Sequence, residues 1–405
     1  MKTSQVPAHV PADRVFDFDM YADPEVQVNC HAAYARLQRL APPVFFTPRN
    51  GGHWMITRHD LMSEIVRDHE HFSTRVMHIP AVSDAPMLLP LTADPPQHTI
   101  WRQILAPYFA PKSVARMNDD LQAFAREVVA GVAARGECDF VRDVAAPFPV
   151  TVFMRMMGLP LERFDDFRLL ADRFFNAHGD DVAAASAPIV AELGALLAAR
   201  RAKRDDGRDD LISHLLDARM PDGEPVAEDK LLSMCFLLFL GGLDTVTNAL
   251  SFAIRNLAER PELQKRLVGD PSLVASLLDE SLRQYGVVNT PRIVARDCER
   301  FGVQFRAGDM VLVPLPIAGW DDGKNADPEV FDIDRATRSH LTFSTGPHLC
   351  LGHFLARAEM RCLLGEWVAQ VGEFSIADGY RPHYRVGTVM ALESLPLRWA
   401  ASAGN

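Results

Sequence analysis

The longest uninterrupted helical pattern in the chain runs from about Ala227 to Ala258. At about 1.5 Å per residue, a helix of this length would measure roughly 48 Å, enough to cross a large domain. Its most apolar part reads LLSMCFLLFLGGL, which is too short to span a bilayer and ends in two glycines and a leucine. We therefore expect a helix that is buried on every side and forms the centre of one large core.

Helical patterns dominate the middle of the chain, and short alternating patterns typical of strands lie towards its two ends. Strands are expected around a turn at residues 50–52 and in an antiparallel pair that turns at residues 307–309. Proline-rich breaks, among them APFPV at 146–150, would divide the helices. The sequence predicts a mostly α fold with a small β-rich part, in one large domain over residues 1–405 with an irregular segment at about 1–20.

The charge and cysteine content restrict location and partners. A formal net charge of -11 argues against wholesale binding to nucleic acid or anionic membranes. The six cysteines are scattered without a CxxC pair, so we expect a reducing, cytoplasmic location and no disulfide framework. The amino terminus lacks the apolar core of a signal peptide, and no membrane anchor is expected.

One cysteine lies in a specific pattern directly before a predicted helix. The pattern is Phe343-x-x-Gly346-x-His348-x-Cys350-x-Gly352. Unpaired N–H groups and the positive end of the helix dipole would favour a thiolate at Cys350. Gly346 permits a turn with positive φ, and Gly352 lets a flat group approach the backbone closely.

Several roles are open to this thiol. As a nucleophile, Cys350 would need a histidine base, but no acid is placed to orient His348 or His353. A zinc ion would need further ligands at short spacing, which the sequence lacks. Haem iron needs only one thiolate, because the porphyrin supplies four other donors. A buried structural cysteine is commoner in general, but the four specified neighbours favour the haem ligand.

The pattern resembles the haem-binding loop of the cytochrome P-450 haem-thiolate monooxygenases. The resemblance extends from about Phe16 to Trp399 and is closest to the soluble bacterial camphor hydroxylase type, in stretches such as GGLDTVTNALSF and GPHLCLGHFLAR. It implies the cytochrome P-450 fold and haem b as the cofactor, with Cys350 as the ligand of the iron.

The long helix is similar to the oxygen-activating segment of that family. Asp244 and Thr245 match its acid–alcohol pair, which implies that Thr245 holds a water at the oxygen site and that Asp244 passes protons inward. Gly241 and Gly242 would make room for O2. A buried Asp244 is costly unless another group pairs with it.

Two further sets of residues match the family. The haem propionates need cationic donors, and the matching residues are His98, Arg102, Arg292 and His348. The spacing Glu280-x-x-Arg283 places both charges on one helix face, and the resemblance implies a buried structural pair that contacts the loop DPEVFDIDR.

The resemblance also indicates the substrate class. The substrate-facing positions of the family match Leu237, Leu240, Gly241, Val288 and Val389. The tyrosine that holds the ketone of camphor has no counterpart, since the nearest positions are Pro86 and Met87. Apolar contacts alone select mainly by shape. We therefore expect a compact monoterpenoid or norisoprenoid as the substrate.

Electron transfer should require separate proteins. The sequence has no GxGxxG after a strand and no cluster of four cysteines, so we expect no flavin or iron–sulfur centre in this chain. The resemblance implies a [2Fe–2S] ferredoxin and its NADH-dependent flavin reductase as partners. The ferredoxin would dock on the face nearest Cys350, where a local basic patch is expected from Arg102, Lys112, Arg116, Arg357 and Arg361.

The leading hypothesis is therefore a haem-thiolate monooxygenase that uses O2 and electrons from NADH to hydroxylate a small hydrophobic compound. A haem-thiolate peroxygenase that uses peroxide directly is the first alternative, and the Asp244–Thr245 pair argues against it. A non-catalytic haem sensor is the second alternative. It would call for a signalling domain, which the sequence does not contain.

Overall fold

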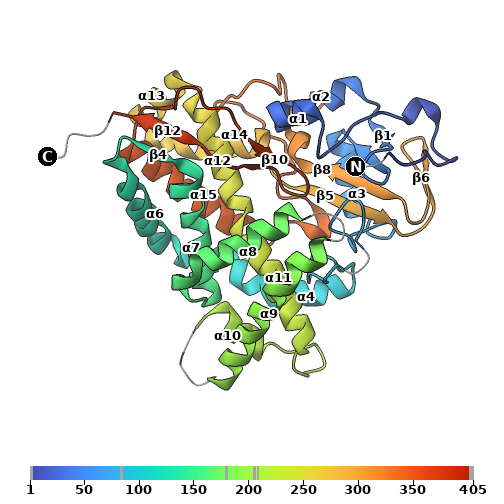
Figure 1. Cartoon of the computed structure of the whole chain (residues 1–405), viewed down its shortest axis with the longest axis horizontal. Coiled ribbons are helices and arrows are strands. Elements are labelled where there is room, and N and C mark those ends of the chain that lie inside the picture. The colour runs from blue at the N-terminus through green and yellow to red at the C-terminus, as the bar shows by residue number, and fades with distance from the viewer. Residues whose placement is uncertain (1–2, 83–84, 178–180, 204–206, 208, 401–405) are drawn as a thin grey trace.

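The computed structural model describes residues 3–82, 85–177, 181–203, 207 and 209–400 (Figure 1). In chain order its α-helices are α1 (Pro24–Val28), α2 (Cys30–Leu40), α3 (His59–Arg67), α4 (Gln97–Phe109), α5 (Pro111–Arg116), α6 (Asn118–Ala133), α7 (Pro147–Met157), α8 (Phe164–Asn176), α9 (Asp181–Ala202), α10 (Leu211–Asp217), α11 (Glu228–Leu243), α12 (Thr245–Ala258), α13 (Pro261–Gly269), α14 (Val274–Gln284) and α15 (His353–Gln370). The predicted predominance of helix is confirmed.

The strands are short. They are β1 (Val44–Thr47), β2 (His53–Ile56), β3 (Phe72–Ser73), β4 (Glu137–Asp139), β5 (Asn289–Val294), β6 (Cys298–Arg300), β7 (Val303–Phe305), β8 (Met310–Pro314), β9 (Phe374–Ile376), β10 (Tyr384–Arg385), β11 (Ala391–Leu392) and β12 (Pro396–Trp399). The largest sheet has the order β1-β2-β8-β5-β3, and it lies on the opposite side of the molecule from α6, α7 and α15 (Figure 1).

The largest sheet joins distant parts of the chain. β1 and β2 form the predicted hairpin around residues 50–52, and Asn50, Gly51 and Gly52 all have positive φ. β2 pairs in parallel with β8, and β8 pairs antiparallel with β5, in a register that sets Arg292 opposite Val311. The pairing of β5 with β8 therefore fixes the backbone position of Arg292.

The long central helix is present but broken. α11 ends at Leu243 and α12 begins at Thr245, because Asp244 between them has non-helical dihedral angles (φ -121°, ψ -39°). The segment Glu228–Ala258 has the length and hydropathy of a membrane span. However, 72% of the residues in its most apolar 18-residue stretch are buried inside the protein. α9 is also long and apolar enough to pass the same test, and 28% of its most apolar 18-residue stretch is buried. The predicted buried central helix is confirmed.

Two details differ from the sequence-based expectations. Residues 146–150 do not interrupt the helices: a π-helical turn, Val141–Ala145, leads directly into α7, whose first residue is Pro147. Proline is tolerated in the first turn of a helix, where its missing N–H has no partner to lose. Gly242 does not make room for O2, because a Cβ atom there would lie 2.2 Å from the Phe153 ring of α7.

The Glu280–Arg283 pair is fully buried. Arg283 donates to both carboxylate oxygens of Glu280 at 2.7 and 2.9 Å. It also donates to the carbonyl oxygens of Gly319 and Pro328, and the backbone N–H of Asp332 donates to Glu280 at 3.0 Å. The predicted contact between this pair and the loop before Cys350 is therefore confirmed.

Neutralising Glu280 should destabilise the protein strongly. The Glu280→Gln variant leaves Arg283 buried without a counter-ion, with Arg335 and Arg338 also close to the lost charge. We expect the free energy of unfolding to fall by about 3–5 kcal/mol in urea titrations.

The exposed Glu262–Lys265 pair is a matched control, because it has the same sequence spacing and an N–O distance of 3.0 Å. The Glu262→Gln variant should lose less than about 1 kcal/mol. Equal losses in the two variants would contradict a structural role for the buried pair.

Candidate active site

The loop that carries Cys350 is held in one conformation by its own backbone. The N–H of Cys350 donates to the carbonyl oxygen of Phe343 at 2.8 Å. Gly346 has a φ of 70°, and a Cβ atom there would lie 2.8 Å from Cγ of Arg67. Nδ1 of His353 donates to the carbonyl oxygen of Cys350 at 2.7 Å. Gly346 is therefore required by both its backbone conformation and its packing.

Cys350 has an exposed surface, although protein atoms surround its sulfur. All six cysteines are free thiols, and Cys350 is the one that is exposed. Burial nevertheless raises the pKa of the Cys350 thiol, opposed by the N–H of Gly352 and by the charge of Arg102.

The expected preference for thiolate is therefore wrong for the protein alone. α15 begins at His353, so Cys350 lies in the loop before the helix and burial outweighs the effect of nearby N–H groups. A metal ion bound to sulfur would reverse this balance, because a coordinating thiol is deprotonated. The space beside Gly352 is also open, since a Cβ atom there would meet only Phe109, at 4.0 Å.

The four predicted propionate ligands come together near this loop. The rings of His98 and His348 lie 4.1 Å apart, measured between centroids. Burial, followed by the charge of Arg102, lowers the pKa of His98 to about 4. Burial is the main cause that lowers the pKa of His348 to about 2, and the nearby His98, Arg292 and Arg102 lower it further. Burial also lowers the pKa of Arg292 to about 10, so positive charge here has too few counter-ions.

This cluster holds buried nitrogens without hydrogen-bond partners. Both ring nitrogens of His98 and Nε of Arg292 are buried without a hydrogen-bond partner among the described residues. The nearby acid Asp94 already accepts from the hydroxyls of Ser73 and Thr74, at 2.5 and 3.1 Å. Buried polar groups are normally paired. The carboxylates of a bound group would accept from the N–H groups of His98 and Arg292, and the propionates of haem fit that requirement.

One member of the cluster was not predicted. His69, just after α3, adds to the repulsion felt by His98 and His348, and its Nδ1 is also unpartnered within the described chain. Its sequence context, DHEHF, has no fixed spacing to the other residues. No local pattern could have identified it.

The break in the central helix holds the acid–alcohol pair. The hydroxyl of Thr245 donates to the carbonyl oxygen of Gly241 at 3.0 Å. Apart from the chain neighbours of Gly241 and the backbone of its own helix, no described atom would lie within 4 Å of a Cβ at this position. The carboxylate of Asp244 is buried and accepts from Nη2 of Arg385 at 3.0 Å through each oxygen. The guanidinium of Arg385 lies 5.4 Å from the centroid of the Phe175 ring of α8. Arg385 is thus the partner that the buried Asp244 requires.

The predicted substrate positions fall into two groups. Leu237, Leu240 and Gly241 lie on consecutive turns of α11, with Leu240 buried and Gly241 exposed. Val288 and Val389 face each other as an isolated antiparallel bridge. The chain thereby brings the second group together from positions far apart in sequence.

The segment around Pro86 and Met87 is fixed to the central helix by its backbone. The hydroxyl of Ser233 donates to the carbonyl oxygen of Met87 at 2.6 Å and accepts from the N–H of Leu89 at 3.0 Å. The side chain of Met87 is exposed, and no hydroxyl replaces the missing tyrosine at these two positions.

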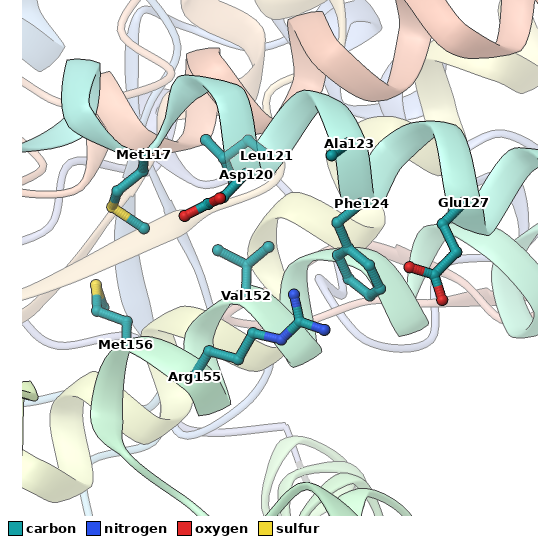
Figure 2. Close-up of a pocket in the computed structure, with 9 residues that line it drawn as sticks. All are labelled: Met117, Asp120, Leu121, Ala123, Phe124, Glu127, Val152, Arg155 and Met156. Carbon is teal, nitrogen blue, oxygen red and sulfur yellow. The ribbon is translucent and has the colours of Figure 1, made fainter.

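A surface groove between α6 and α7 lies apart from these residues (Figure 2). Phe124 of α6 faces Arg155 of α7 across it, with the guanidinium 4.5 Å from the ring centroid. The lining residues are Met117, Asp120, Leu121, Ala123, Phe124, Glu127, Val152, Arg155 and Met156. None of the predicted site residues belongs to this groove.

Comparisons with known proteins agree on one family. The family profile "Cytochrome P450" matches residues 101–270 and 271–370. "Probable cytochrome P450 127A1" of Sinorhizobium fredii is 30% identical over 99% of this chain and 98% of its own length. "Steroid C26-monooxygenase" of Mycobacterium tuberculosis is 31% identical over 95% of this chain and 96% of its own.

A solved structure agrees in fold as well as in sequence. The crystal structure of CYP101J2 superposes with a TM-score of 0.89 at 35% identity, covering 98% of this chain and 100% of that one. The predictions of the P-450 fold, of haem b as the cofactor and of a monooxygenase are confirmed by these matches. The chain therefore belongs to the cytochrome P450 family of haem-thiolate monooxygenases.

Proposed function

We propose that this P450 hydroxylates a small hydrophobic compound, a monoterpenoid or norisoprenoid, in the cytoplasm. One atom of O2 enters a C–H bond of the substrate and the other leaves as water. NADH supplies two electrons, and NADH together with one solvent proton supplies the two protons for that water. A flavin reductase and a [2Fe–2S] ferredoxin would carry the electrons singly. The observation that carries the proposal is the break in the central helix at Asp244 and Thr245, beside the open space at Gly241.

The haem would be held by the cysteine loop and by the residues around His98 and His348. Cys350 would bind the iron, and His98, Arg102, Arg292 and His348 would receive the propionates. The unpaired nitrogens of His98 and Arg292 would gain their hydrogen-bond partners in this way. When bound, the haem supplies the activation of O2, and electron donation from the thiolate favours O–O cleavage. Phe343, Gly346 and Gly352 would shape the loop around it.

Thr245 and Asp244 would deliver the protons. The hydroxyl of Thr245, now bound to the carbonyl of Gly241, would turn to hold a water at the oxygen site. Asp244 lies at the end of an ion pair that leads towards the surface, since the side chain of Arg385 is 12% exposed. Arg385 would act as a positioning residue that orients this carboxylate between turnovers.

The apolar lining supports a compact substrate. Leu237, Leu240, Val288 and Val389 offer no hydrogen-bonding side chain, so binding would depend on shape and regioselectivity would be loose. The hydroxyl of Thr388, next to Val389, donates to the carbonyl oxygen of Met77 at 3.3 Å, which ties this side of the pocket to the segment before Pro86.

Product analysis tests the proposed function. The haem-loaded protein, with a [2Fe–2S] ferredoxin, its reductase and NADH, should convert monoterpenoids that shift the haem spin state. Mass spectrometry should find one labelled oxygen atom in the product when labelled O2 is supplied. Equal rates with peroxide alone would instead favour the peroxygenase. Spin-state shifts without any product under either condition would favour a sensor.

Removing Arg385 should impair turnover but not substrate binding. In the Arg385→Gln variant, the Asp244 carboxylate loses its bidentate partner, and we expect product formation to fall about ten-fold or more. The solvent isotope effect on product formation should rise, and the spin-state titration should stay unchanged. The Arg385→Lys variant should recover part of the rate.

Arg255 provides a matched control near the same strand. Its guanidinium lies 5.7 Å from the ring centroid of Tyr384, and it pairs with Glu259 instead of Asp244. The Arg255→Gln variant should keep the parent rate and isotope effect. A parent-like isotope effect in Arg385→Gln would exclude the positioning role.

A further inference from the structure

One acid lies among the basic residues that are expected to hold the haem. Asp94 stands just before α4, and its carbonyl oxygen accepts from the N–H of His98 at 3.0 Å. Burial lowers the pKa of His98 and of Arg292, and the charge of Asp94 opposes this effect at both residues. The charge of Asp94 therefore acts on two of the proposed propionate ligands.

The carboxylate of Asp94 is held by neutral groups. Its Oδ2 accepts from the hydroxyl of Ser73 at 2.5 Å, and its Oδ1 accepts from the N–H and the hydroxyl of Thr74 at 3.0 and 3.1 Å. Arg75 is close in sequence, but its Nε donates to the hydroxyl oxygen of Ser73 at 3.0 Å. Asp94 forms no ion pair in the part of the chain that the structure describes. Its charge is thus stabilised by hydrogen bonds and is not cancelled by a cation.

These hydrogen bonds join three segments that carry the proposed ligands. Asp94 leads directly into α4, which holds two of them. Ser73 belongs to β3, which pairs with β5, the strand of Arg292. The hydroxyl oxygen of Thr74 lies 3.5 Å from Nε2 of His348 in the cysteine loop. Asp94 therefore fixes these segments relative to one another.

A count of charges shows what would remain after the haem is bound. Arg102 and Arg292 carry the permanent positive charge of the cluster, because burial lowers the pKa of His98 to about 4 and leaves its ring neutral at neutral pH. The two propionates would balance the two arginines. The charge of Asp94 would then have no counter-charge. A negative charge near a redox centre opposes the addition of an electron.

We propose that Asp94 is a positioning residue of the haem site whose uncompensated charge lowers the reduction potential of the iron, which rests on the propionate placement proposed above. Ser73 and Thr74 hold its carboxylate in place beside the ligands. The iron therefore stays oxidised until a strong one-electron donor reaches it.

The proposal is tested by measuring the reduction potential of the haem-loaded protein in a spectroelectrochemical titration. Asp94→Asn removes the charge and keeps an acceptor for Thr74, so one-electron reduction should become about three-fold or more favourable. Asp94→Ser removes the charge through a different side chain, and its potential should rise as well. Asp94→Glu keeps the charge, so its potential should stay closer to the parent value than to that of Asp94→Asn.

Two control variants separate charge from structure. Thr74→Val breaks a hydrogen bond to Asp94 and leaves the charge in place, so it should keep the parent potential. Asp139 is partly buried like Asp94, and its Oδ1 accepts from the N–H groups of Val141 and Leu395 at 3.1 and 3.0 Å. It lies in another sheet, β4-β12-β9, so Asp139→Asn should also keep the parent potential.

Three results would overturn the inference. If the parent binds haem through a thiolate and neither neutral variant at Asp94 raises the potential, the role of Asp94 is wrong while the haem site stands. If Thr74→Val raises the potential as much as Asp94→Asn does, hydrogen bonding and not charge sets the potential. If the parent takes up no haem, the proposed haem placement is wrong and the role of Asp94 is wrong with it.

Discussion

Two buried arginines, together with buried histidines that lack hydrogen-bond partners or counter-ions, are the constraint on which the site depends. His98, Arg102, Arg292 and His348 gather in one place, and burial lowers the pKa of each of them. The acid beside them is already engaged by hydroxyl groups. Next to this cluster, burial keeps the sulfur of Cys350 towards its thiol form. One group that carries two carboxylates and a central metal ion resolves both problems, so haem completes the electrostatics of the interior. Because the haem satisfies groups that are unpaired without it, its binding should also stabilise the fold.

The rest of the architecture holds the parts of this site at fixed positions. The Glu280–Arg283 pair ties α14 to the loop before Cys350, and the central sheet fixes Arg292. The central helix breaks at Asp244, whose carboxylate is bound by Arg385 of strand β10. The break leaves Asp244 and Thr245 outside the regular helix, where their side chains can take part in proton transfer. The ion pair with Arg385 offsets the cost of burying the carboxylate of Asp244.

The sequence predicted correctly those features that depend on residues close together in the chain. The cysteine loop, the positive φ at Gly346, the hairpin at residues 50–52 and the i,i+3 spacing of Glu280 and Arg283 all depend on neighbours close in sequence. Arg385 could not be predicted, since it lies 141 positions from Asp244 and only the tertiary fold joins them. The role expected for Gly242 was wrong because the packing of Phe153 decides it. The preference of Cys350 for thiolate was misjudged because burial, which sequence spacing does not report, outweighs the nearby N–H groups.

The central claim is that the thiolate of Cys350 binds the haem iron. It is tested most directly by the absorption spectrum of the carbon monoxide adduct after reduction with dithionite. The parent protein should absorb at the long-wavelength position that marks thiolate ligation, and Cys350→His should move the band to the shorter wavelength of a histidine-bound haem. A parent adduct at the shorter wavelength, or a Cys350→His adduct that keeps the long-wavelength band, would contradict the account.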